Sequence, residues 1–329
     1  MKYTSITWAN PPTSEAETLR LLQESPQLYL NYCQLSKPWR QQFLAFCEGK
    51  KSLTLTYDTF FRRIFHPDIH PDRLSRFISS ILGIHVRVLR VLPNEDSIIN
   101  GETYLIMDLL AELEDGSLCN IEIQKQGYAF SEERVSCYSA DLVMRQYARV
   151  RGLAGKKFTY KDIKKVYVIV LYEKSPAEFH KHSESYIHHG KTTFQTGLQF
   201  HLLQEYYLIA LDVFRNFHYA NSSNSINSTE QELHSWISFL VTENLNDADQ
   251  LIQKYPWLRE IYQEIAALRT KPEEVLHMWS EALITLDQNS LKYMVDELKD
   301  KVEHQKLALQ QKDEEINSLK RQLAVQKNK

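Results

Sequence analysis

The chain has 329 residues, of which 43% are hydrophobic and 25% charged, with a formal net charge of −3. This content is enough for one large or two modest folded domains, and it excludes a chain that is disordered throughout. The balance of 39 basic and 42 acidic residues excludes the overall positive charge typical of many nucleic-acid binders. Any affinity for DNA must therefore come from a local basic patch.

Nothing in the sequence indicates export or insertion into a membrane. No stretch reaches the roughly 18 consecutive apolar residues of a membrane-spanning helix, and residues 1–20 lack an apolar core flanked by basic residues. The four cysteines form no CxxC pair that would suggest a zinc or redox site, so we expect reduced thiols. No GxxxxGK[ST] or GxGxxG run that would bind ATP or a dinucleotide occurs. We therefore expect a cytoplasmic protein with no membrane partner and no nucleotide cofactor.

The N-terminal part of the chain is expected to be helical. Apolar residues recur at helical spacing between residues 14 and 50, which predicts one or two helices in an N-terminal extension, residues 1–50. A short helix is predicted at residues 56–65. A further helix at residues 71–82 begins with Pro71 and ends at Gly83.

Beyond Gly83 the apolar period changes from that of a helix to that of a strand. Residues 86–92 alternate, and the strand-like runs 104–114 and 117–124 are joined at Asp115-Gly116. Residues 132–149 have the length of a helix, and residues 163–172 form an apolar run typical of a strand buried on both sides. The order helix, three strands, helix, strand predicts a mixed α/β core within a domain spanning residues 51–220.

The last third of the chain is predicted to be helical. After a polar candidate linker at residues 221–228, helices are expected at residues 230–243, 248–269 and 272–286, within a helical region spanning residues 229–288.

Residues 289–329 have the heptad pattern of a coiled coil. One apolar row repeats every seven residues: Val295, Val302, Leu309, Ile316 and Leu323. The partner row contains Leu291, Leu298 and Leu319, but also Gln305, Lys312 and Gln326, which weaken it. We expect a coiled coil of roughly five heptads that makes a homo-oligomer. The alternative is a single helix folded along its own domain.

Two acidic residues lie within predicted strands that are otherwise mostly apolar, Asp108 in YLIMDLLAEL and Glu122 in NIEIQ. A charge in such a strand needs a partner, and two carboxylates side by side repel each other unless a cation lies between them. Mg²⁺ or Mn²⁺ suits an all-oxygen site and can activate water for phosphodiester hydrolysis. The alternative is that both acids are salt-bridged or lie on an exposed sheet face.

The position of Asp108 relative to Glu122 depends on the loop between the two strands. A three-residue loop with Gly116 left-handed would pair Glu114 with Leu118 and Asp108 with Gln124, so that Glu122 lies diagonally beside Asp108. A two-residue loop would pair Asp108 with Ile123 instead.

These residues resemble a known nuclease signature. Asp108, a hairpin and then Glu122-Ile123-Gln124 resemble the Asp…Glu-x-Lys signature of the PD-(D/E)XK nuclease superfamily, whose core has the predicted order of elements. TYDTFFRRIF, RLSRFISSILG, LPNED, EDGSLCNIEIQ and ERVSCYSADLVMRQY resemble successive blocks of the transposase-related, recombination-promoting nucleases of that superfamily. The similarity covers residues 54–215.

The resemblance implies a metal-dependent DNA endonuclease in which Asp108 and Glu122 bind Mg²⁺ or Mn²⁺. Gln124 would occupy the place of the superfamily lysine, where a neutral amide can position water but cannot deprotonate it. Glutamine at this position is common in the transposase-related family. Lys125 is adjacent, but alternation along the strand points it to the opposite face.

The superfamily also places an acid on its first helix. Asp58 is the candidate here and Asp72 the second choice, although Asp58 could equally be a helix N-cap or a salt-bridge partner. On the helix after the signature, the resemblance implies that Arg134, Tyr138 and Gln146 reach the bound phosphate or support the metal ligands. The alternative for these three is packing on the helix surface.

The chain has two runs of basic residues that could contact DNA, with Arg62 as the candidate from the first. The alternative is ordinary solvated helix faces. The runs comprise Arg62, Arg63, Arg73, Arg76, Arg87 and Arg90, and then Arg134, Arg145, Arg149, Arg151, Lys156 and Lys157.

The leading interpretation is a Mg²⁺-dependent DNA endonuclease whose strand breaks promote recombination and which oligomerises through its coiled coil. Complete transposition does not follow from these residues. The alternative is a catalytically weak DNA-binding or scaffold protein that retains the nuclease fold.

Overall fold

The computed structural model describes residues 13–92, 109–125, 131–220 and 228–281, and single positions of the C-terminal segment: 283, 302, 305, 306, 309, 310, 312 and 316. The chain divides into two compact units, Met1–Ala282 and Leu283–Lys329. Asp108 and residues 221–227 of the predicted linker lie outside the described residues.

Three helices form the N-terminal part, where one or two were predicted: α1 (Glu15–Gln23), α2 (Pro26–Gln34) and α3 (Lys37–Cys47). The chain breaks twice because α2 and α3 each begin with a proline in the first turn after an extended serine. These helices belong to the first unit and contact its C-terminal helices. Thr13 Oγ1 donates to the Arg269 carbonyl at 3.0 Å, and the buried Arg269 guanidinium lies 5.5 Å from the Phe46 ring centroid.

Helices α4 (Asp58–Phe65) and α5 (Pro71–Leu82) confirm the two predicted helices. Helix α5 ends at Gly83, whose φ of 67° is left-handed and so favours glycine. Phe65 of α4 and Phe77 of α5 meet Trp236 of α9 (Ser228–Val241), with ring centroids 5.0, 5.4 and 5.8 Å apart. This buried aromatic cluster joins the first two helices of the predicted domain spanning residues 51–220 to the helical region.

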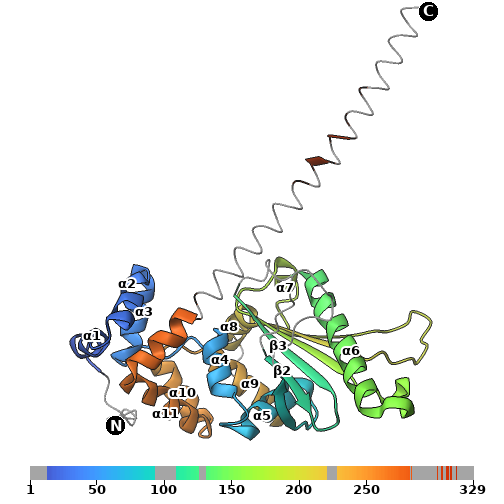
Figure 1. Ribbon diagram of the computed structural model, residues 1–329, viewed down its shortest axis with the longest axis horizontal. Helices are drawn as coiled ribbons and strands as arrows, with labels where there is room; N and C mark the ends of the chain where they lie inside the picture. The colour runs from blue at the N-terminus through green and yellow to red at the C-terminus, as the bar shows by residue number, and fades with distance from the viewer. Residues whose placement is uncertain are drawn as a thin grey trace, which may run out of the picture. The chain divides into compact units, whose positions relative to one another are not determined.

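The core is a six-stranded mixed sheet in the order β1-β2-β3-β4-β6-β5 (Figure 1). Strands β1 to β3 are antiparallel, β3, β4 and β6 are parallel, and β5 runs antiparallel to β6. The strands are β1 (Val88–Leu92), β2 (Leu109–Leu113), β3 (Leu118–Gln124), β4 (Val166–Tyr172), β5 (Ile187–Lys191) and β6 (Gln204–Ala210). The predicted core ended at β4, so β5 and β6 extend it, with the short α7 (Ala177–His180) before them.

Helices cover both faces of the sheet. Helix α6 (Glu132–Ala154), longer than its predicted range, packs Val135, Tyr138 and Leu142 against one face, and α8 (Leu211–Ala220) packs against β4 on the other. All seven residues of β4 are buried, which confirms a strand covered on both sides.

The hairpin between β2 and β3 corrects the predicted register. Its loop has three residues, 114–116, closed by a 2.9 Å bond from the Leu113 amide to the Ser117 carbonyl, with Gly116 left-handed at φ 86°. The predicted pairing of Glu114 with Leu118 is wrong, because Glu112 pairs with Leu118. The offset is two residues, so the face on which each side chain lies is unchanged.

The helical region contains α9, α10 (Leu245–Lys254) and α11 (Leu258–Ala267), and residues 272–281 are also helical. The predicted helix at residues 248–269 is broken near Pro256, which lacks the amide hydrogen needed to continue α10. The segment before α4 joins this region through a 2.9 Å bond from the Ser52 amide to the Glu243 carbonyl. No described helix is both long and apolar enough to cross a bilayer.

In the second unit, the described positions of residues 302–316 are helical. Val302, Leu309 and Ile316, which belong to the predicted heptad row, are 48%, 62% and 46% exposed.

Candidate active site

A polar pair lies within the buried part of β3. Glu122 and Asn120 are 1% and 0% exposed, and they lie on the α6 face beside Val170 and Val168 of β4. Asn120 Nδ2 donates to Glu122 Oε1 at 2.8 Å, whereas Asn120 Oδ1 has no hydrogen-bond partner within the described part of the chain. An unsatisfied buried acceptor costs about 1–3 kcal/mol. A pair that is costly to bury is typical of a functional site.

Sequence reasoning missed Asn120. The signal was available, because Asn120 precedes Glu122 by two residues in NIEIQ and so shares its side of the strand. A second polar side chain on the buried side of an apolar strand needs a hydrogen-bond partner, just as the glutamate needs a partner for its charge.

Gln124 ends β3 on the same face as Glu122. It is half-buried and is paired with Tyr172 of β4, which belongs to the apolar cluster under α6. Lys125, the next residue, extends away from this cluster to the loop before α4. Lys125 Nζ lies 2.7 Å from Thr56 Oγ1 and 3.6 Å from the Tyr57 ring centroid.

Lys125 is the centre of a partly buried charged cluster at the carboxyl ends of β3 and β4. Its Nζ donates to Glu173 Oε2 at 2.5 Å, and Thr56 Oγ1 donates to the same oxygen. Burial lowers the pKa of Lys125, although the nearby Glu173, Glu243 and Asp58 act in the opposite direction. The ammonium is therefore paired with Glu173, and two further acids, Glu243 and Asp58, lie near enough to favour its charged form.

Asp58 is the first residue of α4 and follows the N-cap residue Tyr57, so the N-cap alternative for Asp58 is wrong. Burial raises the pKa of Asp58, while Arg62 and Lys125 act to lower it. The structure thus brings Asp58 to the Lys125 cluster. Asp72, the second choice, is exposed in the first turn of α5.

The three α6 residues implied by the resemblance occupy different settings. Tyr138 is buried in the cluster that contains Val170, the direct neighbour of Glu122 in the sheet, and Arg134 Nη2 donates to the Tyr138 hydroxyl at 3.2 Å. Gln146 is fully buried and its Nε2 donates to the Gly116 carbonyl at 2.6 Å, which stabilises the hairpin. A contact between Gln146 and DNA stays a prediction.

Most arginines of the predicted patch are paired with acids. Arg62 is exposed on α4 and lies close enough to Asp58 to affect its pKa. The pairs are Arg63 with Glu264 and Glu274, Arg73 with Glu264, Arg76 with Glu232, Arg90 and Arg149 with Glu112, and Arg145 with Asp141. These ion pairs indicate that much of the two basic runs belongs to ordinary helix faces and is not available to contact DNA.

The donor atoms on the α6 face fit a hard divalent cation. Glu122 supplies carboxylate oxygens, and Asn120 Oδ1 is a buried oxygen without a described partner. Mg²⁺ and Mn²⁺ prefer such oxygen ligands. No group of three or more His, Cys, Asp or Glu side chains suited to a metal occurs among the described residues, a set that does not include Asp108.

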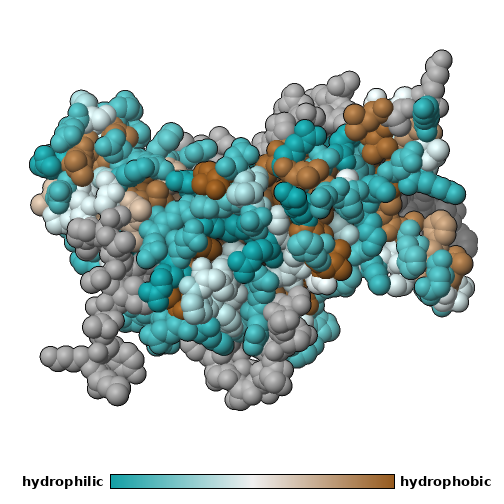
Figure 2. All heavy atoms as spheres, turned by 90° about the horizontal axis from the view of Figure 1, so that it is seen from below, coloured by the Kyte–Doolittle hydropathy of each residue, from teal (hydrophilic) through white to brown (hydrophobic). Residues whose placement is uncertain are grey.

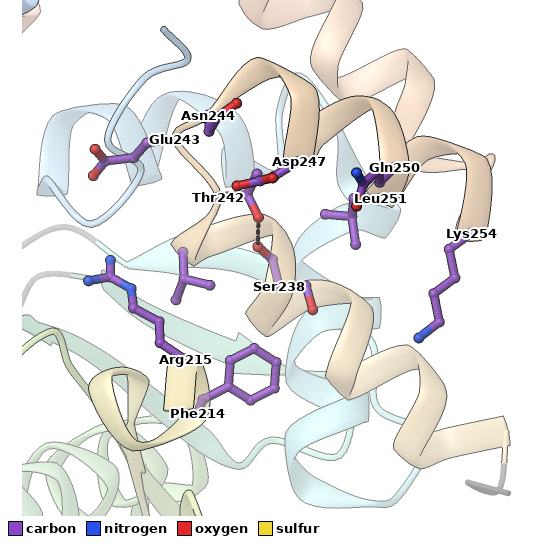
Figure 3. Close-up of a pocket in the computed structure, with 11 residues that line it drawn as sticks. Phe214, Arg215, Ser238, Thr242, Glu243, Asn244, Asp247, Gln250, Leu251 and Lys254 are labelled. Carbon is purple, nitrogen blue, oxygen red and sulfur yellow. Dashed lines mark hydrogen bonds between the residues drawn. The ribbon is translucent and has the colours of Figure 1, made fainter. Parts of the chain in front are cut away.

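A separate cavity of about 530 Å³ lies among α8, α9 and α10 (Figure 3). Thr242 and Ser238, joined by a 2.6 Å hydrogen bond, line it together with Phe214, Arg215, Val241, Glu243, Asn244, Asp247, Gln250, Leu251 and Lys254. None of the predicted site residues lines this cavity. Its lining residue Glu243 accepts a 3.2 Å hydrogen bond from Thr54.

The chain matches a known protein family. The family described as PD-(D/E)XK nuclease family transposase matches residues 55–295. Comparison with curated proteins and with solved structures gives no match. The matched range includes the described sheet, α6 and the helical region through α11.

Proposed function

The chain belongs to the PD-(D/E)XK nuclease family transposases, and from this premise we propose that it is a Mg²⁺- or Mn²⁺-dependent DNA endonuclease with Asp108 and Glu122 as metal ligands. The observation that carries the proposal is the buried pair of Glu122 and Asn120 in an apolar strand. The strand breaks made by such an enzyme would promote recombination.

The proposal extends the β2–β3 ladder by one pair. The last described pair is Leu109 with Ile121, and one more pair in the same register would join Asp108 to Glu122. Two carboxylates directly opposite each other on one face would need a shared cation. A divalent ion held by these acids would supply charge stabilisation at the phosphate and a water of lowered pKa.

The remaining residues of the α6 face would orient the reactants. Gln124 lies two residues beyond Glu122 on the same face, where its amide can position the attacking water but cannot take its proton. Arg134 can offer guanidinium donors to a phosphate oxygen. Asp58 stays a candidate for the first-helix acid, although the structure brings it to the Lys125 cluster.

The direct test is Mg²⁺-dependent nicking of supercoiled plasmid by the purified full chain. Conversion to open-circular DNA that stops with EDTA and returns with Mg²⁺ or Mn²⁺ would support the endonuclease. Binding of DNA without any nicking would instead favour a catalytically weak DNA-binding or scaffold protein. Glutamine in place of lysine at residue 124 is the observation that favours this second candidate.

Gln124→Lys is expected to raise the nicking rate or leave it unchanged. A lysine at this position would add a positive charge that stabilises the charged transition state, in addition to positioning water. The measurement is the initial nicking rate at saturating Mg²⁺, with metal affinity measured in parallel. If activity is lost while metal binding is retained, the amide makes a contact that lysine cannot reproduce, and the role given to Gln124 is wrong.

The proposed enzyme is an oligomer joined by the C-terminal coiled coil. The exposure of Val302, Leu309 and Ile316 supports this proposal, because an apolar stripe left in water on a lone helix is unfavourable. Gln305 and Lys312 in the partner row are compatible with a dimer at some cost in stability. Two linked active sites would suit cleavage of both strands of a duplex.

Light scattering is expected to give a dimer or higher oligomer for the full chain and a smaller particle for a chain ending near residue 289. The matched control is a full-length variant with Val302, Leu309 and Ile316 changed to serine, which should have the smaller mass while retaining the C-terminal segment. A monomeric full chain at micromolar concentration would contradict the coiled coil.

A further inference from the structure

The end of the sheet at which β4 begins carries a locally basic segment. Residues 149–165 run from the end of α6 through the short helices η2 (Gly155–Lys157) and η3 (Tyr160–Asp162) to β4. Their single acidic residue is Asp162, whereas their basic residues are Arg149, Arg151, Lys156, Lys157, Lys161, Lys164 and Lys165. This local excess contrasts with the net charge of −3 for the whole chain.

Several of these charges face solvent without an acidic partner. Arg149 pairs with Glu112 and Lys165 with Glu205. By contrast, the described contacts include no carboxylate within salt-bridge distance of Arg151, Lys157, Lys161 or Lys164, all of which are exposed. Asp162 itself caps η3, with its Oδ2 accepting a 2.8 Å bond from the Thr159 amide. The segment therefore presents unneutralised positive charge.

Three aromatic rings lie among these charges. Tyr147 is stacked with Tyr160 at a centroid distance of 6.1 Å, and Phe158 contacts the two rings edge-on at 5.5 and 5.3 Å. Tyr160 is 76% exposed despite these contacts, and the Arg151 guanidinium lies 5.5 Å from the Tyr147 centroid. Rings usually bury most of their surface. This cluster holds Tyr160 firmly but leaves much of it open to solvent.

The surrounding surface mixes the two kinds of side chain. In Figure 2, hydrophobic and hydrophilic residues lie side by side at the right-hand end of the visible face. We name the basic aromatic surface as Tyr147, Arg151, Lys157, Phe158, Tyr160 and Lys161. It combines flat rings for stacking with cations for phosphates.

We propose that the basic aromatic surface binds single-stranded nucleic acid, with a base stacked on Tyr160 and the backbone phosphates beside Lys157, Lys161 and Arg151. Every base has a π-face that an exposed ring can cover, and phosphates attract cations without regard to sequence. In a duplex the base faces are already stacked, so Tyr160 would contribute little. The inference rests on the proposed function and deepens it, because it assigns single-stranded or unpaired segments as the preferred substrate.

This surface is also connected to the strand that carries Glu122. A side chain at Gly116 would contact Lys164 at 3.5 Å and Arg149 at 3.9 Å, so the basic segment lies over the turn that begins β3. Glu122 is four residues beyond Leu118, or about 13 Å along the strand. The basic segment therefore packs at the start of the strand whose later residues include Glu122.

The experiment measures fluorescence anisotropy of a short labelled oligothymidylate with the full chain in EDTA, so that binding is observed without cleavage. Tyr160→Ala is expected to weaken binding about tenfold, and Tyr160→Phe to retain it, because the ring supplies the stacking. Lys157→Gln with Lys161→Gln should reduce the slope of log affinity against log salt by about 0.7 for each lysine. Tyr29→Ala and Lys37→Gln, at exposed positions of α2 and α3, are the matched controls and should leave binding unchanged.

Two results would overturn the inference. In one, Tyr160→Ala binds the oligothymidylate as tightly as the wild type. In the other, an unlabelled duplex or heparin competes as well as the single strand, which indicates a general polyanion surface. An oligouridylate arm identifies whether RNA or DNA is preferred. Because the assay needs no cleavage, Tyr160-dependent binding without nicking contradicts the proposed nuclease alone, whereas nicking with unaltered binding contradicts this inference alone.

Discussion

Glu122→Gln is expected to lower the rate of Mg²⁺-dependent nicking by at least about 100-fold while leaving the fold nearly intact. The amide has the shape of the carboxylate and can still accept the hydrogen bond from Asn120 Nδ2, which now ends on Glu122 Oε1 at 2.8 Å. It lacks the negative charge needed to hold a divalent cation. Asp108→Ala should have the same effect on nicking, because it removes the other proposed metal ligand. It should also leave the fold nearly intact, since removal of one of two repelling acids does not destabilise the metal-free protein.

A matched control is available on the same face of the sheet. Glu112 of β2 pairs with Leu118 of β3 and forms ion pairs with Arg90 and Arg149, whose side chains hold the pKa of Glu112 below its usual range. Glu112→Gln should lower the melting temperature but leave the nicking rate of the folded protein unchanged. Both quantities are measured on the same preparations. If Glu122→Gln instead loses several kcal/mol of stability and nicks normally, Glu122 is structural.

A further prediction concerns the stability that the Lys125 ion pair gives to the fold. Lys125→Met is expected to lower the free energy of unfolding by about 2 kcal/mol, because it leaves Glu173 without its partly buried cation. Lys125 Nζ is also bonded to Thr56 Oγ1, so the change loosens the loop that begins α4. Chemical denaturation at neutral pH measures the loss.

The double variant Lys125→Met with Glu173→Met tests whether the unpaired Glu173 carboxylate causes the loss of stability. Replacing both partners of a buried ion pair by apolar residues is often close to neutral, so this variant should recover most of the lost stability. Lys271→Met is the matched surface control. Lys271 lies 3.4 Å from Glu274 with 64% of its side chain exposed, and its loss should change stability by less than about 1 kcal/mol.

The same variants test the assignment of Gln124. Lys125 contacts Thr56, Tyr57 and Glu173, away from the α6 face on which Glu122 and Gln124 lie. We therefore expect Lys125→Met to retain nicking at a temperature at which it is folded. Normal stability with complete loss of nicking would mean that Lys125 performs the role of the signature lysine.

Local patterns in the sequence determined most of the central elements. Proline and glycine at the two ends of α5 set its bounds, and the apolar run of β4 required burial on both faces, as observed. Strand alternation placed Gln124 on the face of Glu122 and Lys125 elsewhere. The ordered blocks of residues identified the family, because such blocks combine many weak local constraints.

Only the tertiary structure decided which groups meet. The observed β2–β3 register differs by two residues from the predicted one. A three-residue loop can begin one residue earlier along the chain, and the alternation of side chains between the two faces is the same in both registers. The acids that neutralise Arg63, Arg73 and Arg76 come from helices far along the chain. Long-range contacts of this kind also form the Lys125 cluster. Periodicity is a local property and cannot report them, since they depend on how separate elements pack.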